Sequence, residues 1–89
     1  MLKPSHTRQF EKDLKRMWSC RKSIEKLKKI IGNLVNENPL DTKQRDHNLI
    51  GSYKGRRECH IEPNWLLIYK ITGREKIFER TGTHSDLFK

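Results

Sequence analysis

The sequence predicts an α+β fold: a small, mostly antiparallel twisted sheet with an N-terminal helical hairpin packed on one face, in the order β-α-α-β-β-β. Two observations predict it. Apolar residues recur at helical spacing between residues 7 and 35, and from residue 57 onward they form short, dense runs with the alternation of strands. With 89 residues the chain has the size of one small domain, which we place at residues 1–89.

The first strand and the first helix are predicted before residue 20. Residues 1–3 are mildly apolar, and Pro4 disfavours a helical conformation in the residue before it, so we expect a short strand there. A helix should follow, with Ser5 or Thr7 as its cap, because apolar residues then recur at i, i+4, i+7 and i+8 on one stripe. These residues are Phe10, Leu14, Met17 and Trp18.

A second helix is predicted after a tight turn at Ser19–Cys20. It should end before Pro39, since proline disfavours helix in the residue that precedes it. Its apolar stripe consists of Ile24, Leu27, Ile30, Ile31 and Leu34. Lysine and arginine dominate the outward positions of both helices, so much of the positive charge should lie on this hairpin.

The second half of the chain predicts a long connection and then a sheet. Residues 38–56 carry scattered proline and glycine without a sustained period, which indicates a connection with short extended pieces. Residues 65–71 form a dense apolar run typical of a central strand, and a hairpin loop at 72–75 leads into a last strand at 76–81. The helices should cover one sheet face and leave the other open.

A further strand, predicted at residues 57–61, carries polar side chains on one face. Successive side chains of a strand point to opposite faces, so Cys59 and Ile61 share a dry face while Glu58 and His60 share a wet one. The polar pair should therefore lie on the open face of the sheet.

Charge bounds the partners of the chain. Lys and Arg number 20 against 11 Asp and Glu, a formal net charge of +9, which attracts polyanions. Nucleic acid is the leading partner class, and an acidic protein partner is compatible with the same charge. The apolar runs are far shorter than the roughly 20 residues that span a bilayer, so we expect a cytoplasmic protein with no membrane partner.

Cysteine and histidine spacing argues against disulfides and metal. Cys20 and Cys59 are far apart, which does not suggest a disulfide framework. Metal sites usually place two ligands on one element, as in CxxC or HExxH, and no such motif occurs. We therefore expect no metal site and no cofactor.

Several polar and aromatic residues have no evident structural role. Histidines lie in the connection, on a strand and in the tail: His47, His60 and His84. Arg80 suits bidentate contact with a phosphate, or else pairs with Glu79 or Glu58. Trp65 belongs to the core or offers its face to a base, and Phe88 docks on the sheet or contacts a ligand.

Three blocks in this order, residues 46–51, 57–69 and 80–88, resemble the signature blocks of YafQ-type toxins in the RelE/ParE superfamily. The resemblance covers nearly the whole chain and implies a RelE-like fold, in agreement with the predicted order of elements. It further implies the toxin of a bacterial type II toxin–antitoxin pair: a ribosome-dependent endoribonuclease that cleaves mRNA in the A site.

The resemblance also implies site residues. The catalytic positions of the family fall on His47, His60, Asn64, Arg80 and His84, and the substrate-contacting aromatics fall on Trp65 and Phe88. One position departs from the family, which typically has aspartate where this chain has Asn64. An amide cannot accept a proton at neutral pH. If the aspartate is a base, this chain should be slower by about 10²–10⁴-fold; if it orients a histidine or nucleotide, asparagine keeps much of the function; a third alternative is a substitution that disarms the toxin.

The implied reaction needs no metal. The 2′-OH of RNA attacks the adjacent phosphate, which gives a 2′,3′-cyclic phosphate and a free 5′-OH. Imidazole suits both proton transfers, because its unperturbed pKa of about 6.5 is near working pH. We expect His84 to be the general acid, His60 or His47 to serve as base or electrostatic support, and Arg80 to stabilise the transition-state charge.

The implied partners are the ribosome with its rRNA and mRNA, and a cognate antitoxin. Lys54, Arg56 and Arg57 beside the open face should contact RNA phosphates, and an acidic antitoxin segment suits the same surface. Operator DNA would be contacted through the antitoxin. Two alternative functions are a non-catalytic toxin of the superfamily that inhibits a protein such as gyrase, and a basic nucleic-acid-binding module without chemistry.

Overall fold

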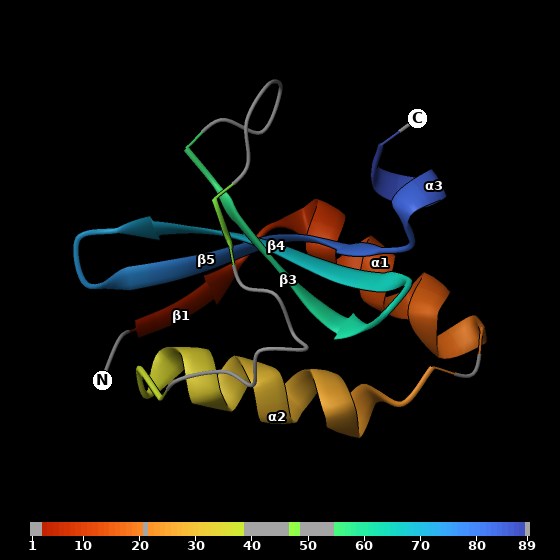
Figure 1. The fold of residues 1–89 in the computed structure, drawn as a ribbon, viewed down its shortest axis with the longest axis horizontal. Helices are drawn as coiled ribbons and strands as arrows, with labels where there is room; N and C mark the ends of the chain where they lie inside the picture. The colour runs from red at the N-terminus through yellow and green to blue at the C-terminus, as the bar shows by residue number, and fades with distance from the viewer. Residues whose placement is uncertain (1–2, 21, 39–46, 49–54, 89) are drawn as a thin grey trace.

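The structure is a computed structural model that describes residues 3–20, 22–38, 47–48 and 55–88. Within these residues five strands form a sheet in the order β1-β5-β4-β3-β2, in which β3, β4 and β5 are antiparallel and β1 is parallel to β5 (Figure 1). The strands are β1 (Lys3–His6), β2 (His47–Asn48), β3 (Arg57–Glu62), β4 (Trp65–Thr72) and β5 (Glu75–Gly82). The helices are α1 (Arg8–Ser19), α2 (Ile24–Val35) and α3 (His84–Leu87). The predicted order is confirmed, with β2 and α3 as short additions.

The first strand, β1, lies at the edge of the sheet. Of the strand predicted at residues 1–3, residues 1–2 lie outside the described residues. Strand β1 includes Pro4, which an edge strand tolerates because no neighbour on its outer side needs the missing N–H. Beyond β1 the chain stays bonded to β5, since the N–H of Thr7 donates to the carbonyl of Phe78 at 3.2 Å. Thr7 also caps α1 by accepting from the N–H of Phe10 at 3.1 Å, which confirms the predicted cap.

The main core lies between the helices and one face of the sheet. From the central strand β4 it takes Trp65, Leu67 and Tyr69. On the opposite face Leu66 and Ile68 of β4 pack with Leu87 of α3. Fully burying one such side chain contributes about 1.5–3 kcal/mol. The face predicted to be open is therefore partly covered, and α3 is the element that covers it, on the side away from α2 (Figure 1).

The stripe of α1 differs from the prediction at two positions. Phe10 and Met17 are buried as expected, but Trp18 is 70% exposed. A carboxylate takes a core position instead: Asp13 is fully buried, and it receives hydrogen bonds from the end of β5. Apolar periodicity could not reveal the burial of Asp13, because hydrogen bonds from β5 hold its carboxylate in place.

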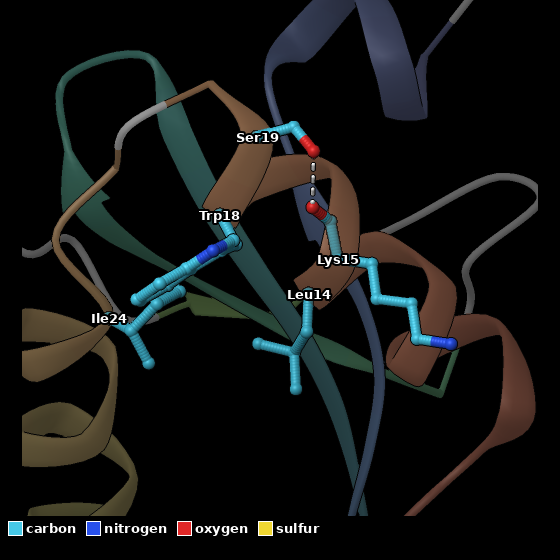
Figure 2. A pocket seen from close by; sticks show the side chains of 5 residues that line it. All are labelled: Leu14, Lys15, Trp18, Ser19 and Ile24. Carbon is cyan, nitrogen blue, oxygen red and sulfur yellow. Dashed lines mark hydrogen bonds between the residues drawn. The ribbon is translucent and has the colours of Figure 1, made fainter.

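The two long helices of the predicted hairpin pack over different strands on the same face of the sheet. α1 lies along β5, and α2 contacts β3. Between them is an apolar hollow, which we call the α1–α2 hollow, where the indole of Trp18 lies beside Ile24 (Figure 2). Leu14, Lys15 and Ser19 complete its lining. The hollow is on the helical side of the molecule, whereas the polar cluster described below is on the other side of the sheet.

The C-terminal end of α2 is tied to the sheet by a buried amine. Lys76 of β5 donates from Nζ to the carbonyl of Leu34 at 2.7 Å, and its Nζ lies 5.4 Å from the ring centre of Tyr69. A cation is favourable at a helix C-terminus, where the last carbonyls have no partner within the helix. This lysine therefore serves the fold.

In the described residues no helix is long and apolar enough to cross a membrane. Both cysteines carry free thiols: Cys20 is exposed and Cys59 is buried.

Candidate active site

The polar face of β3 forms one side of the candidate site. Strand register places Glu58 beside Ile68 of β4, which pairs in turn with Arg80 of β5. His60 lies two residues further along β3 on the same face, opposite Leu66. The side chains were expected to be wet, yet Glu58 is 5% and His60 8% exposed. Burial of two polar groups requires partners, and they meet each other: Glu58 Oε1 lies 3.1 Å from His60 Nε2.

The short helix α3 brings His84 over this face. A capping box starts the helix: Thr83 Oγ1 accepts from the N–H of Asp86 at 3.2 Å, and Asp86 Oδ2 accepts from the N–H of Thr83 at 3.0 Å. The exposed ring of His84 then lies 5.8 Å from the ring of His60, centre to centre. The ring of Phe88, which is 41% exposed, lies 6.2 Å from that of His84, centre to centre.

Asn64, in the turn between β3 and β4, fixes the orientation of His84. Its Oδ1 accepts from the backbone N–H of His84 at 3.2 Å and contacts Nδ1 of the ring at 3.0 Å. Because the backbone N–H can only donate, the amide must turn its oxygen toward His84. Nδ1 therefore carries a hydrogen, and Nε2 of the neutral ring keeps its lone pair for chemistry. A carboxylate is not needed for this contact, so an orienting role for residue 64 is compatible with asparagine.

Arg80 is anchored by Asp13 of α1. Its Nε donates to Asp13 Oδ2 at 2.8 Å and its Nη2 to Asp13 Oδ1 at 3.4 Å. Glu79, one of the two expected partners, instead pairs with Arg56. The side chain of Arg80 is 24% exposed, so its guanidinium still reaches the surface of the sheet.

Trp65 does not have the role that was assigned to it. The side chain is fully buried, its Nε1 donates to Thr81 Oγ1 at 2.9 Å, and that hydroxyl donates to the carbonyl of Leu66 at 2.7 Å. A base cannot stack on an indole that lies in the core. The prediction that Trp65 binds substrate is therefore wrong, and the residue anchors the strand that follows Asn64.

The remaining predicted residues are only partly described. His47 pairs with Glu58 in the register of β2 and β3, which assigns its backbone to the same row of the sheet. Arg57 of β3 donates to Asn48 Oδ1 at 2.8 Å. Lys54 lies outside the described residues.

Sequence reasoning missed a donor set that is suited to a metal ion. One ligand atom from each of Glu58, His60 and His84 lies within 4.8 Å of the other two. Glu58 and His60 are a pair on one element, because positions i and i+2 of a strand share a face. This i, i+2 spacing on a strand differs from the CxxC and HExxH spacings that usually indicate a metal site. Asp13 was also missed, since only the three-dimensional fold brings it to Arg80.

The fold and the site together define a class of protein: a small basic α+β domain with histidines gathered on the sheet face opposite its long helices. The family model for the YafQ bacterial toxin of type II toxin–antitoxin systems matches residues 2–89. The chain is 47% identical over 81 residues to the mRNA interferase toxin YafQ of Escherichia coli K12, covering 90% of this chain and 88% of that protein.

Solved structures agree with this assignment. In the E. coli DinJ–YafQ complex, a chain that is 42% identical superimposes with a TM-score of 0.92 and full coverage of both chains. A metal-bound toxin from Helicobacter pylori, 40% identical, gives a TM-score of 0.92 and covers 99% of this chain and all of that one. The chain therefore belongs to the YafQ family of bacterial toxins of type II toxin–antitoxin systems, which confirms the resemblance found in its sequence.

Proposed function

We propose that this toxin is a ribosome-dependent endoribonuclease of the cytoplasm that cleaves mRNA in the A site. The observation that carries the proposal is the placement of His84, an exposed imidazole oriented by Asn64 and lying beside the Glu58–His60 pair. The name of the E. coli relative, an mRNA interferase, supports the same activity. A non-catalytic toxin or a simple binding module would not need this arrangement.

In the proposed reaction the 2′-oxygen of the substrate attacks the adjacent phosphorus while the bond to the 5′-oxygen breaks. His84, protonated at Nε2, gives its proton to the leaving 5′-oxygen. The Glu58–His60 pair takes the proton of the 2′-OH, with the carboxylate stabilising the imidazolium that forms. A positioned acid or base typically contributes about 10²–10⁴-fold to the rate.

Arg80 would stabilise the extra negative charge of the transition state. In the register of the sheet it lies two strands from Glu58, a separation of about 10 Å at the usual strand spacing. A nucleotide spans this distance. Because Asp13 holds the guanidinium from behind, little reorganisation would be needed when the phosphate arrives.

The decisive experiment is primer extension on mRNA in translating ribosomes with the wild type, His84→Ala and Ser85→Ala. Ser85 is an exposed neighbour on the same short helix and serves as the matched control. We expect codon-phased cuts with the wild type and Ser85→Ala, and a loss of at least about 10²-fold with His84→Ala. If the wild type does not cut ribosomes that another A-site nuclease cleaves, the enzymatic proposal is rejected.

A cognate antitoxin is the proposed regulatory partner, as the DinJ–YafQ complex supports for the E. coli toxin. With a net charge of +9, the toxin favours an acidic segment that would cover its RNA-binding surface. Operator-DNA contacts would then come from the antitoxin. Excess antitoxin should block both ribosome binding and cleavage in the assay above.

A second role is favoured by the donor set at the site and by the metal-bound relative. We propose that Cu²⁺ or Zn²⁺ binds Glu58, His60 and His84 and inhibits the enzyme by occupying the nitrogens that move protons. The 3.1 Å between Glu58 and His60 is close to the roughly 3.3 Å between donors of a tetrahedral site with ligand bonds of about 2.0–2.1 Å. Rotation of the exposed His84 ring would complete the site.

Calorimetric titration with Zn²⁺ tests this role without an activity assay. We expect one-to-one binding to the wild type and a loss of at least tenfold in affinity with Glu58→Gln, since structural zinc sites need each ligand. EDTA should restore cleavage after zinc inhibition. Equal zinc affinity for the wild type and a Glu58→Gln, His84→Ala double variant would place any bound metal elsewhere.

A further inference from the structure

We propose that Arg16 of α1 is a positioning residue that holds α3, and with it His84, over the candidate site. Arg16 would do so within a series of three ion pairs that connects Arg80, Asp13, Arg16 and Asp86 in this order. This series of ion pairs connects the two sides of the candidate site, which are Arg80 on β5 and the helix α3 that carries His84. The expected effect on cleavage rests on the proposed function, whereas the expected effect on the position of α3 does not.

The carboxylate of Asp13 anchors this series of ion pairs. It is fully buried and accepts hydrogen bonds from four residues: Gln9, Arg16, Arg80 and the backbone N–H of Thr81. Thr81 lies beyond the end of β1, where among the described residues no strand pairs with this edge of β5, so the carboxylate accepts the hydrogen bond that a strand would otherwise accept. A buried charge with this many donors is held in one position.

Arg16 carries the restraint from this anchor to α3. Its Nη2 donates to Asp13 Oδ1 at 3.0 Å, and its Nε lies 3.8 Å from Asp86 Oδ2. The packing around this contact is tight: a Cβ added at Gly82 would lie 3.0 Å from Asp86 Cβ and 3.4 Å from Arg16 Nη2. The absence of a side chain at position 82 therefore lets Asp86 approach both the strand and the arginine.

α3 needs such external support. A four-residue helix is far below the length at which helices are stable on their own. Its other restraints include the capping box, the buried Leu87 and the contact of His84 with Asn64. His84 is the first residue of α3, so a shift of this helix displaces the imidazole relative to His60. A displacement of about 1 Å at a reacting group can cost up to roughly 10²-fold in rate.

The test compares Arg16→Gln with Lys12→Gln, a matched loss of one exposed cation from the same helix. We expect both variants to raise KM to a similar small extent, and Arg16→Gln alone to lower the saturating cleavage rate about tenfold. Arg16→Lys should restore part of the rate. Asp86→Asn, which keeps an oxygen for the capping box, should resemble Arg16→Gln, and the double variant should be no worse than either single one.

A second readout does not depend on nuclease activity. In ¹H–¹³C spectra, the ring signals of His84 should shift or broaden in Arg16→Gln and Asp86→Asn, and stay in place in Lys12→Gln. Unchanged His84 signals in both Arg16→Gln and Asp86→Asn would overturn the proposal. So would a loss of rate matched by global unfolding in circular dichroism. If the wild type does not cleave mRNA, the spectra still decide whether Arg16 positions the helix.

Discussion

Asn64 makes two contacts to a single residue, and both end on the same oxygen. Aspartate at this position would keep the two hydrogen bonds to His84 and add a negative charge. A charge-assisted hydrogen bond is roughly twice as strong as a neutral one, so the contact with His84 would be stronger. The amide thus preserves the geometry of His84 and gives up part of the electrostatic support.

For Asn64→Asp we expect cleavage on ribosomes to rise about five- to tenfold, because a charge-assisted hydrogen bond would hold the general acid His84 more firmly. Asn64→Ala, which removes the acceptor, should lower the rate instead. Equal rates for asparagine and aspartate would mean that a charge at residue 64 does not act through His84.

Of the two aromatic residues predicted to contact the substrate, Phe88 is exposed and Trp65 is in the core. We expect Phe88→Ala to raise KM by about five- to 10²-fold, as stacking contributes about 1–3 kcal/mol per base. The thermal midpoint should stay within a degree or two, because the side chain is exposed. Steady-state cleavage and a melting curve check both statements, and a fall in the saturating rate alone would contradict the stacking role.

Trp65→Phe should show the opposite pattern. The hydrogen bond to Thr81 would be lost from a fully buried site, which costs about 1–3 kcal/mol of unfolding free energy. Cleavage per folded molecule should change less than threefold. Urea denaturation measures the loss of stability, and cleavage is measured at equal concentrations of native protein. Lower stability with unchanged cleavage separates this outcome from the loss of a substrate contact.

At the scale of elements, the start of α2 is tied to the end of β3 by one carboxylate. Glu62 accepts from Lys26 Nζ at 2.8 Å and from Lys22 Nζ at 3.2 Å. The hydrogen bond from Lys26 is the main cause that holds the pKa of Glu62 below its ordinary value of 4.5, with Lys22 adding to it and desolvation opposing it. The contribution is therefore present above pH 4.5 and is lost as the pH falls through the lower, folded-state pKa.

From this we expect Glu62→Gln to lower the unfolding free energy at pH 7 by about 0.5 kcal/mol, a small value because solvent screens the pair. The difference from the wild type should vanish near pH 3. Denaturant curves at both pH values provide the measurement. Lys26→Met should give a similar loss, and a deficit that stays constant down to pH 3 would assign the effect to packing.

The elements differ in how far the sequence predicts them. The stripe of α2 and the apolar run of β4 are unambiguous, because burial on a whole face leaves a periodic pattern. The exposed Trp18 and the buried Asp13 of α1 break that pattern, and contacts with a distant strand explain the burial of Asp13. α3 has too few residues to show a period at all, although its capping box is written in Thr83 and Asp86.

The candidate site was predictable in its residues more than in its contacts. His60 and His84 were identified from their sequence blocks, and the structure brings their rings together. Their partners were not identified: Glu58 looked like a solvent-facing residue of the same strand, and Asp13 is 67 residues from Arg80 in the sequence. Alternation assigns a face to a side chain, but it does not say whether a later segment will cover that face.

For the whole molecule, the net charge of +9 predicts how binding depends on salt. Each neutralised phosphate contributes a slope of about −0.7 to −0.9 to log K against log salt. Between 50 and 200 mM salt we expect ribosome affinity to fall at least tenfold while the saturating cleavage rate stays constant. His84→Ala should show the same slope in a filter-binding assay, and a slope near zero would exclude phosphate contacts as the source of affinity.

The strand order also governs when the protein acquires its activity during synthesis. β5 lies between β1 and β4, so the earliest strand of the sheet has no partner until the latest one has been made. The anchor for Arg80 and the platform for α3 depend on the same strand. A ribosome adding about 5–20 residues per second therefore carries an inactive chain for most of the time it takes to translate it. Activity arises only when β5 joins the sheet. An antitoxin that was synthesised earlier can therefore be present before the toxin becomes active.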